Sequence, residues 1–186
     1  MSELEHPQAP AGKGRKYALA ECERRFLLAR LPDQPVVRTA VITDRYLTGT
    51  RVRLRRMVET VEGRTTAFFK LTQKIPAMEG APGLLTTMYL SEAEYGVFAA
   101  LPAGELRKTR YGMPPLGVDV FEPPLHGLTT AEAEFDSREK AASFTPPPFV
   151  VAEVTRDVRF SGGRLVASSR EELRRALAEY GLELGD

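Results

Sequence analysis

The feature that most constrains the fold of this chain is a two-residue alternation of charged and other side chains that recurs in many short segments. Residues 21–25 read Glu-Cys-Glu-Arg-Arg, so Glu21, Glu23 and Arg25 share one face if the segment is a β-strand. Residues 51–55 place three arginines on one face and two apolar residues on the other. This period is typical of strands, because neighbours on a helix face lie three or four residues apart. We therefore expect a sheet whose strands carry rows of charge.

The alternation and the turn residues between segments predict about eight strands and few helices. The expected strands cover residues 21–28, 36–46, 51–55, 65–74, 84–90, 106–111, 117–121, 131–135 and 149–160. Residues 131–135 also fit the first turn of a helix, but their row of glutamates favours a strand. Capping boxes at Ser91 and Ser169 predict helices that begin there, and a short helix is expected after Ser137. We therefore predict a mainly β (α+β) fold: a closed eight-stranded antiparallel barrel with a few flanking helices.

Composition limits the classes of function. The 186 residues suit a single domain over residues 17–186, preceded by a polar, flexible tail at residues 1–16. The net charge of +1 is far from the basic signature of a nucleic-acid-binding protein. No apolar run is long enough to span a membrane, and the lone Cys22 excludes an internal disulfide framework. We expect a cytoplasmic protein that binds neither nucleic acid nor membrane, and the sequence leaves open whether it forms a homodimer.

The charged rows point either outward to solvent, which is ordinary, or inward. Inward rows would line a polar tunnel, and their charges would need partners because unpaired buried charges are very costly. Nine bases belong to the candidate face: Arg25, Arg51, Arg53, Arg55, Lys70, Lys74, Lys108, Arg110 and Arg159. Six carboxylates belong to it: Glu21, Glu23, Asp119, Glu132, Glu134 and Glu153. The excess of positive charge predicts an anionic ligand that carries several charges.

These rows, in their order and spacing, resemble the CYTH family, also called triphosphate tunnel metalloenzymes. The resemblance runs from about residue 17 to residue 165. The segments that carry it are residues 21–27, 51–53, 70–74, 108–111, 119–121, 132–135 and 153–157. It implies an eight-stranded antiparallel tunnel that binds a triphosphate together with Mg²⁺ or Mn²⁺.

The resemblance, taken with the candidate face, predicts the roles of individual residues. The catalytic group is Glu21, Glu23 and Arg25, where Arg25 replaces the family's usual lysine with a planar fork of donors. The predicted substrate-binding residues are Arg51, Arg53, Lys70, Lys74, Lys108, Arg110 and Arg159. The predicted metal ligands are Glu21, Glu23, Asp119, Glu132, Glu134 and Glu153.

One strand departs from the family pattern. The family's central strand commonly reads R-x-E-x-E, whereas residues 86–90 read Thr-Thr-Met-Tyr-Leu, so one base and two acids are missing. We predict a metal-dependent hydrolase of inorganic triphosphate or a small organic triphosphate. Two alternatives stay open. A class IV-type adenylate cyclase would release pyrophosphate and cyclic AMP, and a polyphosphate- or nucleotide-binding module would bind without turnover.

Overall fold

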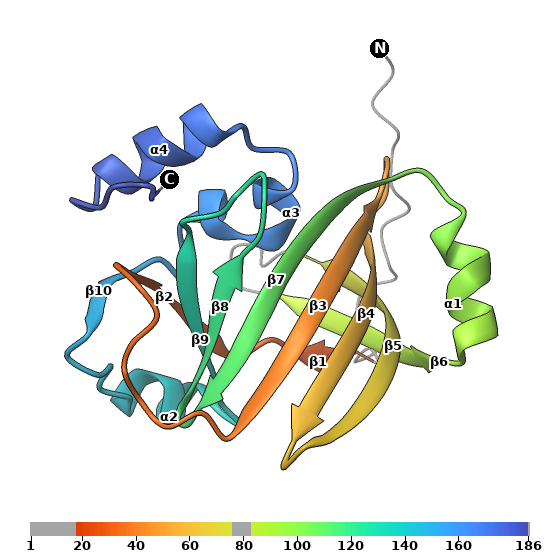
Figure 1. Cartoon of the computed structure of the whole chain (residues 1–186), viewed down its shortest axis with the longest axis horizontal. Helices are drawn as coiled ribbons and strands as arrows, with labels where there is room; N and C mark the ends of the chain where they lie inside the picture. The colour runs from red at the N-terminus through yellow and green to blue at the C-terminus, as the bar shows by residue number, and fades with distance from the viewer. Residues whose placement is uncertain (1–17, 76–82, 186) are drawn as a thin grey trace, which may run out of the picture.

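The structure is a computed structural model that describes residues 18–75 and 83–185, and it shows a mainly β protein (Figure 1). One ten-stranded sheet has the order β1-β6-β5-β4-β3-β7-β8-β9-β2-β10. The strands are β1 (Leu19–Ala20), β2 (Glu23–Leu28), β3 (Arg38–Leu47), β4 (Val52–Val61), β5 (Arg64–Ile75), β6 (Leu84–Leu90), β7 (Ala103–Met113), β8 (Leu116–Phe121), β9 (Thr129–Glu134) and β10 (Val150–Glu153). All of their pairings are antiparallel.

Five short helices accompany the sheet. They are α1 (Glu92–Ala99), α2 (Arg138–Ser143), the 3-10 helix η1 (Val158–Phe160), α3 (Gly162–Leu165) and α4 (Arg170–Ala178). The capping boxes predicted at Ser91 and Ser169 are both formed. No helix in the described ranges is long and apolar enough to cross a membrane. The predicted tail at residues 1–16 lies outside the described residues.

The prediction of a mainly β, antiparallel protein is confirmed, but that of a closed eight-stranded barrel is not. The sheet has ten strands, and its pairing order ends at β1 and β10 without closing. The chain still connects its two flanks, because only Glu21 and Cys22 separate β1 from β2. Glu21 donates its backbone N–H to Gly83 beside β6 at 3.1 Å, and the Cys22 carbonyl accepts from Phe135 beside β9 at 2.8 Å. This two-residue link holds the flanks of the curved sheet close together.

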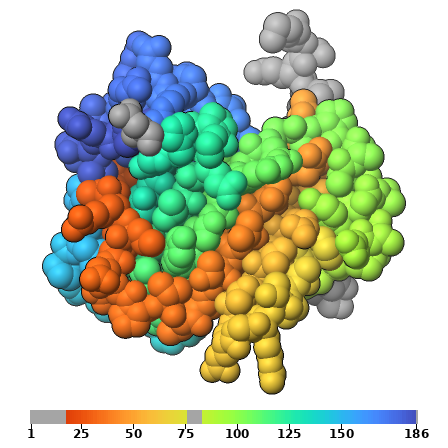
Figure 2. All heavy atoms as spheres, viewed as in Figure 1, coloured from red at the N-terminus to blue at the C-terminus, as the bar shows by residue number. Residues whose placement is uncertain are grey.

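Residues 51–55 and 65–74, both predicted as strands, lie in β4 and β5, which pair as a hairpin. Its turn places Glu62 at φ 49° and Gly63 at φ 76°, in the left-handed region that two-residue hairpin loops require. Glycine adopts this conformation without steric cost. The tip is exposed and projects beyond the rest of the molecule (Figure 2).

The strand predicted over residues 149–160 is wrong beyond Glu153. After β10 the chain turns, and the Asp157 side chain accepts the backbone N–H of Arg159 at 3.0 Å at the start of η1. This local hydrogen bond satisfies the backbone in place of a strand ladder. Helix α3 begins at Gly162, directly after η1 and Ser161. A Cβ atom on Gly162 would lie 2.0 Å from the Tyr46 hydroxyl, so glycine permits this close approach.

The buried core limits one end of the sheet's inner face, by which we mean the face that carries Arg25, Lys108 and Asp119. Leu27, Leu106 and Phe121 lie on the same face. Each is two residues along its strand from one of these three charged residues. These apolar side chains are buried against the C-terminal segment, in one cluster with Phe160, Leu165, Leu173 and Leu177. The C-terminal helices, blue in Figure 1, therefore seal the apolar end of the inner face.

A second core cluster covers the opposite, outer face of β2, β8 and β9. It contains Phe26, Val118 and Ala131, with Phe144 packed against them at the end of α2. The Phe26 and Phe144 ring centroids lie 6.1 Å apart. These three strands are thus covered on both faces, which makes the middle of the inner face a protected environment.

The contacts of Asp157 predict a loss of stability in acid. Asp157 accepts hydrogen bonds from the Arg159 guanidinium and the Tyr180 hydroxyl, and these lower its pKa from 3.8 to about 2 against the opposing effect of burial. A carboxylate with a depressed folded-state pKa stabilises the fold above about pH 4, and this contribution is lost as the pH falls toward 2. We expect Asp157→Asn to cost about 1 kcal/mol at pH 7 and to show a smaller stability loss than wild type between pH 4 and pH 2.

Urea unfolding at pH 7, 4 and 2.5 measures this difference. Asp136→Asn is the matched control, because Asp136 forms an exposed ion pair with Lys140. Equal pH dependence in wild type and Asp157→Asn would contradict the assignment.

Candidate functional site

The cross-strand register gathers most of the predicted site residues on the inner face. Residues directly opposite one another on antiparallel strands point to the same side. Arg25 lies opposite Glu132, and Arg55 lies opposite both Asp44 and Lys70. The register and the ion pairs together place these predicted residues on the inner face: Glu21, Glu23, Arg25, Arg53, Lys70, Lys74, Lys108, Arg110, Asp119, Glu132 and Glu134.

Asp119 is the centre of a buried ion-pair network on β7, β8 and β9. Its side chain is fully buried and accepts from Lys108 and from two nitrogens of Arg110, each 2.7 Å away. Arg110 also donates to Glu132. Although burial raises it, the nearby cations, Arg110 first among them, hold the pKa of Glu132 well below its ordinary value. Glu132 is therefore ionised, and both carboxylates are paired with basic side chains of the protein.

Arg25 extends this network to the acids of β2. It donates to Glu132 at 3.2 Å and forms a short ion pair with Glu23. Burial, together with the carboxylates of Glu132 and Glu21, raises the pKa of Glu23 to about 7. Glu21 pairs with Lys74 at 2.6 Å. The nearby bases Arg25 and Lys74 therefore do not offset the burial of Glu23 and the charge of its neighbouring carboxylates.

Asp44 on β3 is a site residue that the sequence analysis missed. It is 1% exposed and accepts from Arg55 Nε and Nη2 at 2.6 and 2.7 Å. Arg53 Nε lies 3.7 Å from the same carboxylate. Burial raises the pKa of Asp44, but Arg55 and Arg53 outweigh it and lower the pKa. The only sequence signal was one acid between the uncharged inward residues Ile42 and Tyr46 of β3.

Two inner-face bases have hydrogen-bond donors available for a ligand. Arg53 Nε is buried without a hydrogen-bond partner. Lys70 Nζ lies 4.9 Å from the centroid of the Tyr89 ring, and within the described part of the chain it pairs with no carboxylate. Basic side chains with unused hydrogen-bond donors bind anions through charge-assisted hydrogen bonds.

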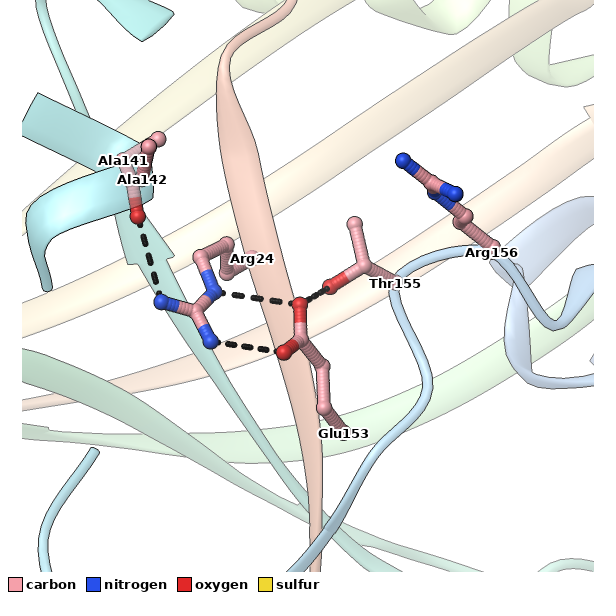
Figure 3. Close-up of a pocket in the computed structure, with 6 residues that line it drawn as sticks. All are labelled: Arg24, Ala141, Ala142, Glu153, Thr155 and Arg156. Carbon is pink, nitrogen blue, oxygen red and sulfur yellow. Dashed lines mark hydrogen bonds and ion pairs between the residues drawn. The ribbon is translucent and has the colours of Figure 1, made fainter. Parts of the chain in front are cut away.

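The structure does not bring Glu153 together with the other predicted metal ligands. Glu153 lies opposite Phe26, on the outer face, and accepts from Arg24 at 3.0 and 2.6 Å. Figure 3 shows this pair in a pocket with Ala141, Ala142, Thr155 and Arg156. Arg24 also donates to backbone oxygens beside α2, so the pair fastens that helix to the sheet.

Three other predicted residues lie at or beyond the edge of the inner face. Arg159 belongs to η1 and pairs with Asp157 and Glu179, away from the network. The strand predicted to carry it ends earlier, and this is why the prediction misplaced it. Arg51 is exposed just before β4, and Glu134 is exposed opposite Glu23 at the end of β9.

The acidic side of the site suits a cation by its chemistry. Within residues 18–75 and 83–185, no three acidic, histidine or cysteine side chains converge into a ready metal site. The raised pKa of Glu23 nevertheless marks a cluster of carboxylates short of positive charge. Carboxylate oxygens are the ligands that Mg²⁺ and Mn²⁺ prefer. The donors therefore fit such an ion in type and charge.

Fold and site together define a class: antiparallel β proteins whose inner face combines buried acid–base networks with bases left available. No family model matches the sequence. The chain is 32% identical over 159 residues to an inorganic triphosphatase from Nitrosomonas europaea, covering 81% of this chain and 99% of that protein. A crystal structure of an inorganic triphosphatase matches with a TM-score of 0.52 and 26% identity, covering 80% of this chain and 98% of that one. A crystal structure of a hypothetical protein matches with a TM-score of 0.53 and 26% identity, covering 80% and 99%.

The extent and identity of the match to the Nitrosomonas protein show the family. This chain belongs to the CYTH family of triphosphate tunnel metalloenzymes. The resemblance inferred from the order of charged rows is thereby confirmed.

Removing the Asp44 carboxylate should destabilise the fold strongly. Asp44→Ala leaves Arg55 buried without its partner, and such uncompensated charges typically cost roughly 3–5 kcal/mol. Chemical denaturation of wild type and variant measures the difference in unfolding free energy. Glu105→Ala is the control, since it breaks surface ion pairs with Arg45 and Arg107 worth less than about 1 kcal/mol. A loss at Asp44 no larger than that of the control would contradict a buried, obligatory pair.

Proposed function

We propose that this protein is a metal-dependent triphosphatase that hydrolyses a phosphoanhydride bond of inorganic triphosphate or a small organic triphosphate. The observation that carries the proposal is the division of the inner face into two parts. One part holds carboxylates short of positive charge around Glu23, and the other holds Arg53, whose buried Nε makes no hydrogen bond, and Lys70. A triphosphate with its metal ion complements both parts. The inorganic triphosphatase relative supports the reaction class.

The bases would bind the phosphate groups. Arg53 and Lys70 offer donors that the described carboxylates leave unsatisfied, and Arg110 and Lys108 lie on the same face beside Asp119. Charge-assisted hydrogen bonds to phosphate oxygens are strong in a protected site. The same donors stabilise negative charge as it develops on the leaving phosphate, and this positioning provides most of the catalysis in phosphoryl transfer.

The acids would hold the metal ion. Glu21 and Glu23 are the proposed ligands, and Glu132 is the neighbouring carboxylate whose charge acts on Glu23. A bound Mg²⁺ or Mn²⁺ supplies Lewis-acid polarisation of phosphoryl oxygens. Arg25 donates to Glu23 and Glu132, so its proposed role is to orient these carboxylates.

One observation favours a second candidate, binding without turnover. The inward positions of β6 are Leu85, Thr87 and Tyr89, none of which is charged. The strand on which the family commonly carries two acids thus contributes no carboxylate to the inner face. A protein of this kind would bind triphosphates tightly and release no product.

Phosphorus NMR tests the proposal with wild-type protein, Mg²⁺ and an equimolar mixture of inorganic triphosphate and ATP. We expect orthophosphate and pyrophosphate to appear from triphosphate, and chelation of the metal to stop the reaction. Glu23→Gln should slow turnover by at least roughly tenfold because it weakens the metal site. Glu105→Gln, on the outer surface, is the matched control and should retain activity.

The products separate the candidates. Persistence of both substrates with Mg²⁺ and again with Mn²⁺ would overturn the triphosphatase proposal and favour the binding module. Cyclic AMP and pyrophosphate without orthophosphate would identify an adenylate cyclase.

A further inference from the structure

We propose that Tyr89 is a specificity-determining residue: its ring forms a platform on which the aromatic group of an organic triphosphate stacks. The inference rests on the proposed function and narrows its substrate class. It predicts that the Tyr89 ring contributes to the binding of triphosphates that carry an aromatic group and contributes nothing to the binding of inorganic triphosphate.

The register places Tyr89 beside the candidate phosphate site. Tyr89 lies opposite Lys70, Lys70 lies opposite Arg55, and Arg55 lies opposite Asp44. These four residues therefore form one row across β6, β5, β4 and β3 on the inner face. A ligand held by Lys70 has the Tyr89 ring as its immediate neighbour.

Tyr89 is also open to a ligand. It is 70% exposed, although its neighbour Lys70 is half-buried and Thr72, the next inward residue of β5, is buried. The Lys70 ammonium lies 4.9 Å from the ring centroid, a cation–π distance that fixes the two groups relative to each other. A fixed, exposed ring next to a phosphate-binding base can stack an aromatic group at little ordering cost.

Three strands separate Tyr89 from Leu106, the residue of the same cross-strand row that the C-terminal segment buries. The C-terminal segment meets the sheet at Tyr46 and Gly104, where Gly162 and Val166 approach. These positions share a cross-strand row with Arg53, Thr72 and Thr87. Tyr89 is one inward position farther along β6, and its exposed ring is accessible to a group attached to phosphates held by Lys70.

The test is the specificity constant kcat/KM for ATP, thiamine triphosphate and inorganic triphosphate. Stacking on an aromatic side chain is typically worth about tenfold in affinity for one ring. Tyr89→Ala should therefore lower kcat/KM by about tenfold for whichever organic triphosphate is the substrate, and by less than about twofold for inorganic triphosphate. Tyr89→Phe, which keeps the ring, should restore the wild-type ratio. The ATP and thiamine triphosphate arms show which aromatic group is used.

Met88→Ala is the matched control, because Met88 is the adjacent, exposed residue on the other face of β6. It should leave all three constants unchanged. An equal loss for inorganic and organic substrates in Tyr89→Ala, or no loss for either organic substrate, would overturn the inference.

Direct binding separates this inference from the proposed function. If wild type hydrolyses none of the three compounds, the triphosphatase proposal fails, and calorimetric titration of the same proteins with the same compounds and Mg²⁺ then tests the platform. Weaker binding of an organic triphosphate alone in Tyr89→Ala would support it. Equal affinities in wild type and Tyr89→Ala would overturn it.

Discussion

The structure depends on buried carboxylates that are shared between basic side chains. Asp119 lies between Lys108 and Arg110, and Asp44 holds Arg55 with Arg53 nearby. Removing such groups from water costs several kcal/mol per ion, and only well-formed partners repay it. Each shared acid therefore allows two bases to occupy a face that would otherwise exclude them. The same contacts fix the bases in place, so the site is organised before any ligand arrives.

This arrangement divides the inner face into regions of different character. The strands β7, β8 and β9 carry a network around Asp119 in which acids and bases neutralise one another. On β4 and β5, Arg53 and Lys70 have hydrogen-bond donors that are not used within the protein. Glu23 on β2, in contrast, lies among other carboxylates. The short link through Glu21 and Cys22, which holds the flanks of the sheet together, brings these regions to one site. A single anion with several charges and its cation therefore suit the face better than separate ligands would.

The sequence predicted the rows of this face well because side-chain direction in a strand depends only on parity. Alternation put Glu23 with Arg25, and Lys108 with Arg110, on one side of their own strands without knowledge of the pairing partners. Asp44 was missed because a lone acid between uncharged inward residues forms no row. Arg159 was misplaced because the strand was extended past Glu153, where the Asp157 cap turns the chain instead. Glu153 was misplaced because alternation does not say which face of a strand turns inward, and its register opposite Phe26 puts it on the outer face. Closure of the barrel depends on pairing between distant segments, and alternation carries no information about that.

The central claim is that the inner face binds a triphosphate and a metal ion together. A crystal structure with Mn²⁺ and a triphosphate analogue that resists hydrolysis tests it most directly, because anomalous scattering locates the manganese independently of the phosphates. We expect the manganese beside Glu21 and Glu23, and phosphate oxygens within hydrogen-bond distance of Arg53 and Lys70. A triphosphate bound at the outer pocket of Arg24 and Arg156, or manganese remote from both glutamates, would contradict the account.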